Sequence, residues 1–184
     1  MDTLNFSKLL LKTAFTCMAC DGDIDKREIQ LIKQLHEEKN MFGEIDINEE
    51  VNNLSFAINK DGHRFFKDYF NDLTQSVLSE ANELKLIEVA IDTIKADEKV
   101  EYSEVKFFKV IRSKLKIENE PILEKHPDFE AYLEQDIISQ SYLSRLQDDF
   151  FDTQNLPDFV LINEIDIEAL MRSKEGGVGD GKES

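Results

Sequence analysis

Apolar side chains recur at steps of three and four residues along most of the chain, and this spacing constrains the fold more than any other feature. Over residues 5–19 it predicts an amphipathic helix whose apolar positions are Leu10, Leu11, Ala14, Phe15 and Met18. The pattern continues in a second helix after an acidic turn, a third over residues 47–62 and a fourth over residues 63–78. Only three Pro and seven Gly occur among 184 residues, fewer than turn-rich β architectures need. The sequence predicts an all-α fold.

The opening pattern is repeated further along the chain with a constant offset of 76 residues. Apolar residues again occupy the five equivalent positions, which are Leu86, Ile87, Ala90, Ile91 and Ile94. The apolar residues of the second helix also find counterparts, with Val105, Phe108 and Ile111 matching Ile29, Ile32 and Leu35. We therefore predict a compact bundle of seven or eight helices with a pseudo-two-fold internal repeat of helical hairpins, over residues 5–42 and 81–117.

Each predicted hairpin turns through a cluster of acidic residues. Clustered carboxylates on a turn can converge on one hard cation of the Ca²⁺ or Mg²⁺ class. The candidate metal ligands are Asp21, Asp23, Asp25 and Glu28 in the first turn and Asp97, Glu98, Glu101 and Glu104 in the second. An EF-hand is excluded, because counting from Asp21 places Lys26 where that loop needs Gly and Ile32 where it needs a bidentate Glu.

A purely structural explanation of the acidic turns stays open. Asp25 and Glu28 have the spacing of a helix N-cap and its partner, and acids in a first helical turn complement the helix dipole. Asp21 followed by Gly22 is common turn chemistry. Asp23 is matched by Lys99 in the second copy, so that ligand is not required twice.

The segments "MACDGDIDKREIQLIKQL" and "IKADEKVEYSEVKFFKVI" resemble the TerB-like family of tellurite-resistance proteins. The resemblance covers about residues 5–117 and reaches toward residue 150. It implies a compact helical fold with approximate internal two-fold symmetry, and a role in the response to tellurite and chemical stress. It also implies divalent metal binding, for which Asp21, Glu28, Asp97 and Glu104 occupy the matching positions. The second copy departs from the family's "DG", because Glu98 follows Asp97.

The charge of the chain narrows its range of partners. A formal net charge of −17 repels phosphate backbones, which argues against nucleic acid and favours cations or the basic faces of protein partners. No stretch approaches the roughly 18 apolar residues of a membrane span, so membrane insertion is not expected. The start "MDTLNFSKLL" lacks the features of a cleavable signal, and two Cys form no disulfide framework. These features predict a cytoplasmic protein.

Other candidate sites have simpler explanations. Cys17 and Cys20 have the spacing of a zinc or redox pair, but they end a helix and fall opposite Thr93 and Ala96 in the repeat, which indicates small packing residues. The three His are scattered, and the aromatic groups at 65–70, 107–108 and 150–151 have the spacing of core residues. Because no nucleophile–base motif or phosphate-binding Gly loop occurs, we do not expect an enzyme.

The chain divides into three parts in this interpretation. Residues 1–150 form the TerB-like helical domain, residues 151–171 form an apolar segment that packs back on the bundle or docks on a partner, and residues 172–184 form a flexible tail. The first functional hypothesis is a non-catalytic stress-response module that binds a divalent cation through its acidic turns. The alternative is an adaptor that engages a protein partner and whose acidic turns are purely structural.

Overall fold

The computed structural model describes residues 2–21, 26–96 and 102–133, and within these ranges it contains eight α-helices and no strand. The α-helices are α1 (Thr3–Met18), α2 (Lys26–Lys39), α3 (Ile47–Lys60), α4 (Gly62–Gln75), α5 (Glu80–Ala96), α6 (Tyr102–Lys114), α7 (Asn119–Lys125) and α8 (Glu130–Leu133). Two short 3-10 helices are η1 (Ala19–Asp21) and η2 (Pro127–Phe129). The prediction of a compact all-α bundle is confirmed.

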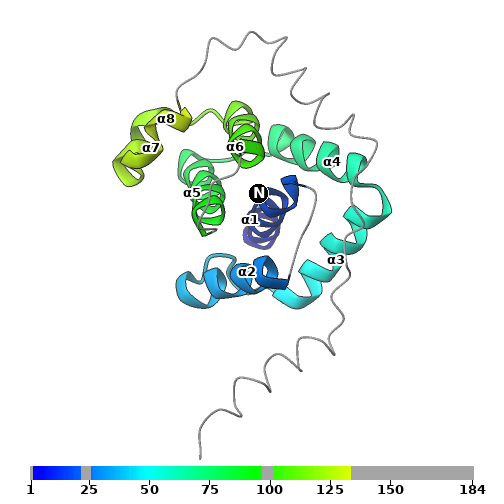
Figure 1. Cartoon of the computed structure of the whole chain (residues 1–184). Coiled ribbons are helices and arrows are strands. Elements are labelled where there is room, and N and C mark those ends of the chain that lie inside the picture. The colour runs from blue at the N-terminus through cyan, green and yellow to red at the C-terminus, as the bar shows by residue number, and fades with distance from the viewer. Residues whose placement is uncertain (1, 22–25, 97–101, 134–184) are drawn as a thin grey trace, which may run out of the picture.

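Helix α1 is the central element of the bundle. Figure 1 shows it surrounded by α2, α3, α4, α5 and α6, and its most extensive packing is against α5. The sequence predicted one apolar face, but residues on nearly every side of α1 are buried, among them Leu9, Thr13 and Cys17. A helix surrounded on all sides must be apolar, or internally hydrogen-bonded, on all sides. Thr13 and Thr16 meet this requirement by donating their hydroxyls to backbone carbonyls one turn earlier.

The five apolar positions of the predicted repeat are buried in both copies. In α1 they are Leu10, Leu11, Ala14, Phe15 and Met18, and in α5 they are Leu86, Ile87, Ala90, Ile91 and Ile94. Equal burial is what a repeated hairpin requires, and any two amphipathic helices that share one core would show it too. The two-fold relation between the hairpins stays a prediction.

One aspartate both ends α3 and begins α4. The backbone N–H of Asp61 donates to the carbonyl of Ala57 at 3.2 Å, and its carboxylate accepts the N–H of Arg64 at 2.9 Å. The predicted stop at Asp61 is confirmed, but Gly62 already belongs to α4 and not to a loop. Helix α4 ends at Gln75, three residues before the predicted end, because the backbone turns to an extended conformation at Ser76 (φ −70°, ψ 127°).

The aromatic groups at residues 65–70 and 107–108 lie in the core, as predicted. Phe65, Phe66, Tyr69, Phe70, Phe107 and Phe108 are all buried. Neighbouring rings meet edge to face, for example Phe15 with Phe65 at 5.9 Å and Phe66 with Phe107 at 5.8 Å between centroids. Such pairs add about 0.5–1.5 kcal/mol each beyond the area they bury. They hold α4 against α1 and α6.

Several sequence predictions concern residues that the structure does not describe. The apolar segment 151–171, the flexible tail 172–184, the aromatic pair 150–151 and the turn residues 22–25 and 97–101 lie outside the described ranges. Within those ranges, no helix combines the length and the apolar character that crossing a bilayer needs.

Candidate functional site

The structure describes only part of the predicted acidic turns. Glu28 lies in the first turn of α2 and Glu104 in the first turn of α6, and both are partly buried. The backbone of Asp21 ends η1. The other candidate ligands, Asp23, Asp25, Asp97, Glu98 and Glu101, lie outside the described residues. The convergence of the four carboxylates of either turn on a cation therefore stays a prediction.

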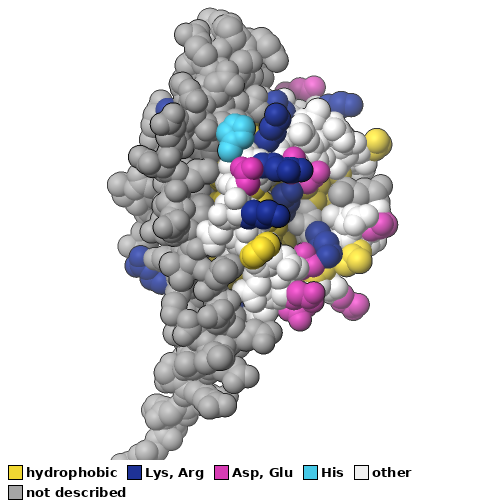
Figure 2. Space-filling model, turned by 90° about the vertical axis from the view of Figure 1, so that its right-hand side faces the viewer, with side chains coloured by type: hydrophobic (Ala, Val, Ile, Leu, Met, Phe, Trp, Pro, Cys, Tyr) yellow, Lys and Arg dark blue, Asp and Glu magenta, His cyan; other side chains and the backbone are white. Residues whose placement is uncertain are grey.

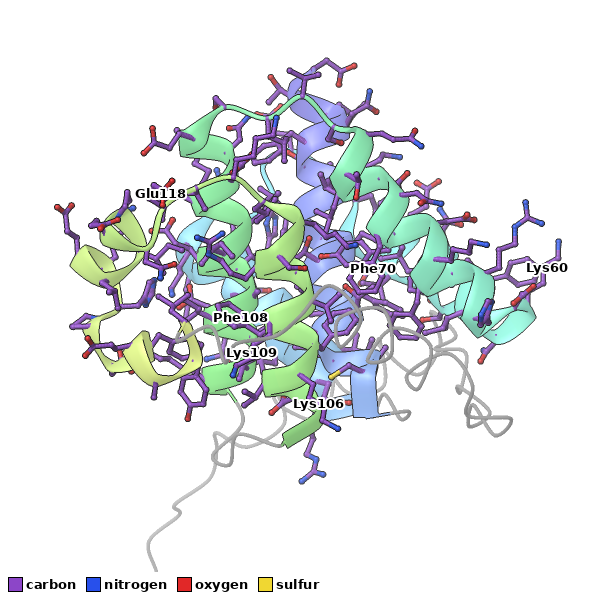
Figure 3. The ribbon with its side chains drawn as sticks, turned by 90° about the horizontal axis from the view of Figure 1, so that it is seen from above. Lys60, Phe70, Lys106, Phe108, Lys109 and Glu118 are labelled. Carbon is purple, nitrogen blue, oxygen red and sulfur yellow. The ribbon has the colours of Figure 1, made fainter. Side chains whose placement is uncertain are left out.

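The elements that flank the two turns meet at one end of the bundle. The 3-10 helix η1, which leads into the first acidic turn, packs against α6, which follows the second. In Figure 3 the start of α6, marked by Lys106, lies beside the C-terminal end of α1. Burial raises the pKa of the Cys17 thiol in the last turn of α1, and Glu104 is close enough to raise it further. The fold thus brings together the chain segments from which both acidic turns begin or end.

Glu28 and Glu104 have a structural role as well. An acid in the first helical turn faces the unpaired N–H groups and the positive end of the helix dipole, which stabilises the helix by about 0.3–1 kcal/mol. Both residues also take part in interactions within the protein. Among the residues that the structure describes, no three His, Cys, Asp or Glu side chains are grouped as a metal site.

The two cysteines are packing residues, as the sequence indicated. Cys17 and Cys20 are both buried, with 1% and 7% of their surfaces exposed, and they form no disulfide with each other. Burial raises the pKa of the Cys17 thiol, and the nearby Glu104 carboxylate raises it further. A thiol in this environment stays protonated at neutral pH, whereas redox and zinc chemistry both need a thiolate. The position of these residues does not support either chemistry.

A buried hydrogen bond joins α1 and α4, and no sequence pattern predicted it. The Tyr69 hydroxyl donates to Thr13 Oγ1 at 3.1 Å, and both residues are fully buried. Thr13 in turn donates to the carbonyl of Leu9 at 2.8 Å. The spacing of Tyr69 predicted that it lies in the core. The partner of its hydroxyl, Thr13, is 56 residues away along the chain and could not be predicted in the same way.

A surface hollow with a volume of about 850 Å³ lies between α1, α3 and α4. Figure 2 views the α3–α4 side of the molecule, where Lys and Arg side chains lie among Asp and Glu side chains. The basic residues around the hollow are Lys8, Lys12, Lys60 and Arg64, and the acidic residues are Glu50, Asp61, Asp68 and Asp72. Four charges of each sign leave this hollow electrically balanced.

Two ion pairs cross the hollow from α1. Lys8 pairs with Glu50 of α3, and Lys12 pairs with Asp72 of α4 at 2.8 Å. The ammonium of Lys12 also lies 5.5 Å from the centre of the Phe65 ring, which forms part of the floor. Exposed pairs of this kind contribute about 0–1 kcal/mol each. These pairs join α1 to α3 and to α4 at the edges of the hollow, and they add little to the stability of the fold.

Comparison with protein families, with curated proteins and with solved structures finds no match to this chain. The resemblance to the TerB-like family therefore stays a prediction from the two quoted segments.

Proposed function

We propose that this protein is a non-catalytic module that binds a divalent cation at the end of the bundle where η1 meets α6. The observation that carries the proposal is the contact between η1 and α6, which brings the flanks of the two acidic turns to one place. The proposed cation binding agrees with the resemblance to the TerB-like family, which also implies a role in the response to tellurite or chemical stress.

The electrostatics of the chain favour such binding. Ca²⁺ and Mg²⁺ take oxygen ligands, and each bound ion offsets two of the 17 excess negative charges. A ligand that binds the folded state alone also stabilises it, by about 2.7 kcal/mol at a concentration of 100 times Kd. Binding should therefore appear both as heat in a titration and as a higher melting temperature.

Calorimetric titration of the full chain with Ca²⁺ and with Mg²⁺ tests the proposal. The test variant is Glu28→Gln/Glu104→Gln, which removes the two described carboxylates. The matched control is Glu80→Gln/Glu120→Gln, which removes two exposed glutamates from the first turns of α5 and α7. We expect saturable binding to the wild type and the control, and affinity about tenfold or more lower in the test variant.

The control separates a site from general attraction. At about 0.15 M salt, long-range attraction to the acidic surface is screened beyond about 8 Å. Equal losses of affinity in both variants would mean that the cation is attracted by the net charge of the protein and is not bound at a specific site. That result, or the absence of saturable heat in the wild type, would refute the cation proposal.

The second candidate is the adaptor, and the hollow between α1, α3 and α4 favours it. Its floor includes Leu9 and Phe65, and it is large enough to receive a segment of another protein. Among the described residues no side chain pairs with Lys60, so its ammonium is available to bind an acidic group of a partner protein. Capture of a protein by the wild type and by a Lys114→Glu/Lys116→Glu control, but not by Lys60→Glu/Arg64→Glu, would support this function.

A further inference from the structure

A second hollow lies where the end of α2, the middle of α5 and the end of α7 meet. In Figure 1, α3 and α4 lie on one side of α1, and α5 and α7 lie on the other, so the two hollows are well separated. The volume of this hollow is about 420 Å³, within the usual range of about 300–1,000 Å³ for small-molecule sites. Leu10 and Val89 form a buried apolar floor, and Met41 is partly buried beside them.

Three ammonium groups follow α5 along this hollow, one helical turn after another. Lys85 belongs to α5 itself. One turn further on, Glu88 binds Lys125 of α7, and after another turn Asp92 binds Lys39 of α2 at 2.6 Å. Side chains three or four residues apart on a helix are about 5–6 Å apart at Cβ. Lys85, Glu88 and Asp92 therefore share one face of α5, and the two ion pairs bring Lys125 and Lys39 to that face, so the three lysines follow one another in a row along it.

The row carries more positive than negative charge. Three lysines face two carboxylates, and His126 also lines the hollow, whereas charges in the α1–α3–α4 hollow cancel. Among the described residues no side chain pairs with Lys85. Each ammonium has three N–H donors, so Lys39 and Lys125 keep donors after binding Asp92 and Glu88. Such an excess is unusual on a chain whose net charge is −17.

Helix dipoles explain only part of this arrangement. Lys39 and Lys125 lie in the last turns of α2 and α7, where a cation complements the negative end of the helix. Lys85 lies in the second turn of α5, beyond the first turn in which the helix dipole acts on a charge, so the dipole does not explain its position. It is exposed and has no described carboxylate partner, so neither helix stability nor ion pairing accounts for its place in the row.

We propose that this hollow binds a small organic polyanion: a molecule with two or three carboxylate or phosphate groups in a row and a short apolar portion. The anionic groups lie along Lys85, Lys125 and Lys39, and the apolar portion rests on Met41 and Val89. The site shares no residue with the acidic turns, so this inference does not depend on the cation proposal.

Calorimetric titration of the full chain with citrate and with pyrophosphate, in buffer freed of divalent cations on a chelating resin, tests the inference. We expect Lys85→Ala to weaken binding about three- to tenfold, because it removes one charged contact and leaves both ion pairs in place. The matched control is Lys116→Ala, which removes another exposed lysine and should not change the affinity. Lys85→Arg should restore most of the binding, since it restores the charge.

The two probes distinguish the two sources of the anion. Binding of citrate alone assigns the site to carboxylates, binding of pyrophosphate alone assigns it to phosphates, and binding of both supports the shared chemistry. Amide shifts around Lys85, Glu88 and Asp92 in the NMR spectrum of the titrated protein would place either probe in this hollow. The inference is wrong if neither probe binds the wild type, or if Lys116→Ala weakens binding as much as Lys85→Ala does.

Discussion

Oε2 of Glu83 accepts a hydrogen bond from the backbone N–H of Ile117 at 2.7 Å, across 34 residues of chain. The same oxygen accepts the N–H of Lys116 at 2.7 Å, and only 7% of the surface of Glu83 is exposed. Two backbone N–H groups in the connection between α6 and α7 are thus satisfied by one carboxylate from the start of α5. The contact fastens the connection between α6 and α7 to the start of α5.

We predict that Glu83→Ala lowers the free energy of unfolding by about 2–4 kcal/mol. The substitution leaves two N–H groups without an acceptor, and hydrogen bonds to a charged group contribute about 1.5–3 kcal/mol. Glu83→Gln keeps an acceptor oxygen and should cost less. Urea denaturation measures both, with Glu80→Ala as the control, because Glu80 is an exposed residue of the same first turn. Similar losses for Glu80→Ala and Glu83→Ala would contradict this role.

The buried hydroxyl of Tyr69 leads to a prediction about alkaline pH. Burial raises the pKa of Tyr69 above its ordinary value, while the same side chain ionises near pH 10 in the unfolded chain. The unfolded state therefore loses this proton first, and stability that is fully present below about pH 10 declines as the pH rises further. In Tyr69→Phe no such proton exists.

We therefore expect Tyr69→Phe to be less stable than the wild type at neutral pH, by about 0.5–1.5 kcal/mol, and to lose less stability between about pH 9 and pH 11. Urea denaturation at several pH values measures both effects. Tyr132→Phe is the control, because Tyr132 is only partly buried. Parallel stability curves for wild type and Tyr69→Phe above pH 9 would contradict the assignment.

Substitutions of Phe108, which is buried, and Phe56, which is exposed, test which residues form the core. Phe108 is fully buried, and its ring lies 5.3 Å from that of Phe129, whereas 60% of the surface of Phe56 is exposed. Figure 3 shows Phe108 inside the bundle. Phe108→Ala should cost about 3–5 kcal/mol, and Phe56→Ala less than about 0.5 kcal/mol. Thermal or urea unfolding compares them, and a large loss for Phe56→Ala would show that this ring is covered in solution.

The predicted helices and most of their buried faces agree with the structure because the signal is local. The spacing that predicted a buried aromatic group at residues 65–70 of α4 follows from the helical period of 3.6 residues, whatever the helix packs against. The same reasoning underestimated α1, where Thr13 is buried as well. A central helix is distinguished from a peripheral one by its neighbours, and those come from distant parts of the chain.

The candidate sites were less predictable from sequence. The acidic turns could be found because their residues are consecutive, and the structure adds that η1 and α6, which flank them, are in contact. Nothing in the sequence separates Glu83 from Glu80, or sets Lys85 apart from other lysines. Their roles depend on Ile117 and on Lys39 and Lys125, which approach them only in the folded bundle.

By itself the sequence determined that this chain forms helices, where most of them begin and end, and which faces are apolar. These properties arise from interactions between residues a few positions apart. The tertiary structure decided which helix is central, which carboxylate is buried and which lysines line up along α5. Those outcomes depend on contacts between residues tens of positions apart, and such contacts exist only once the chain has folded.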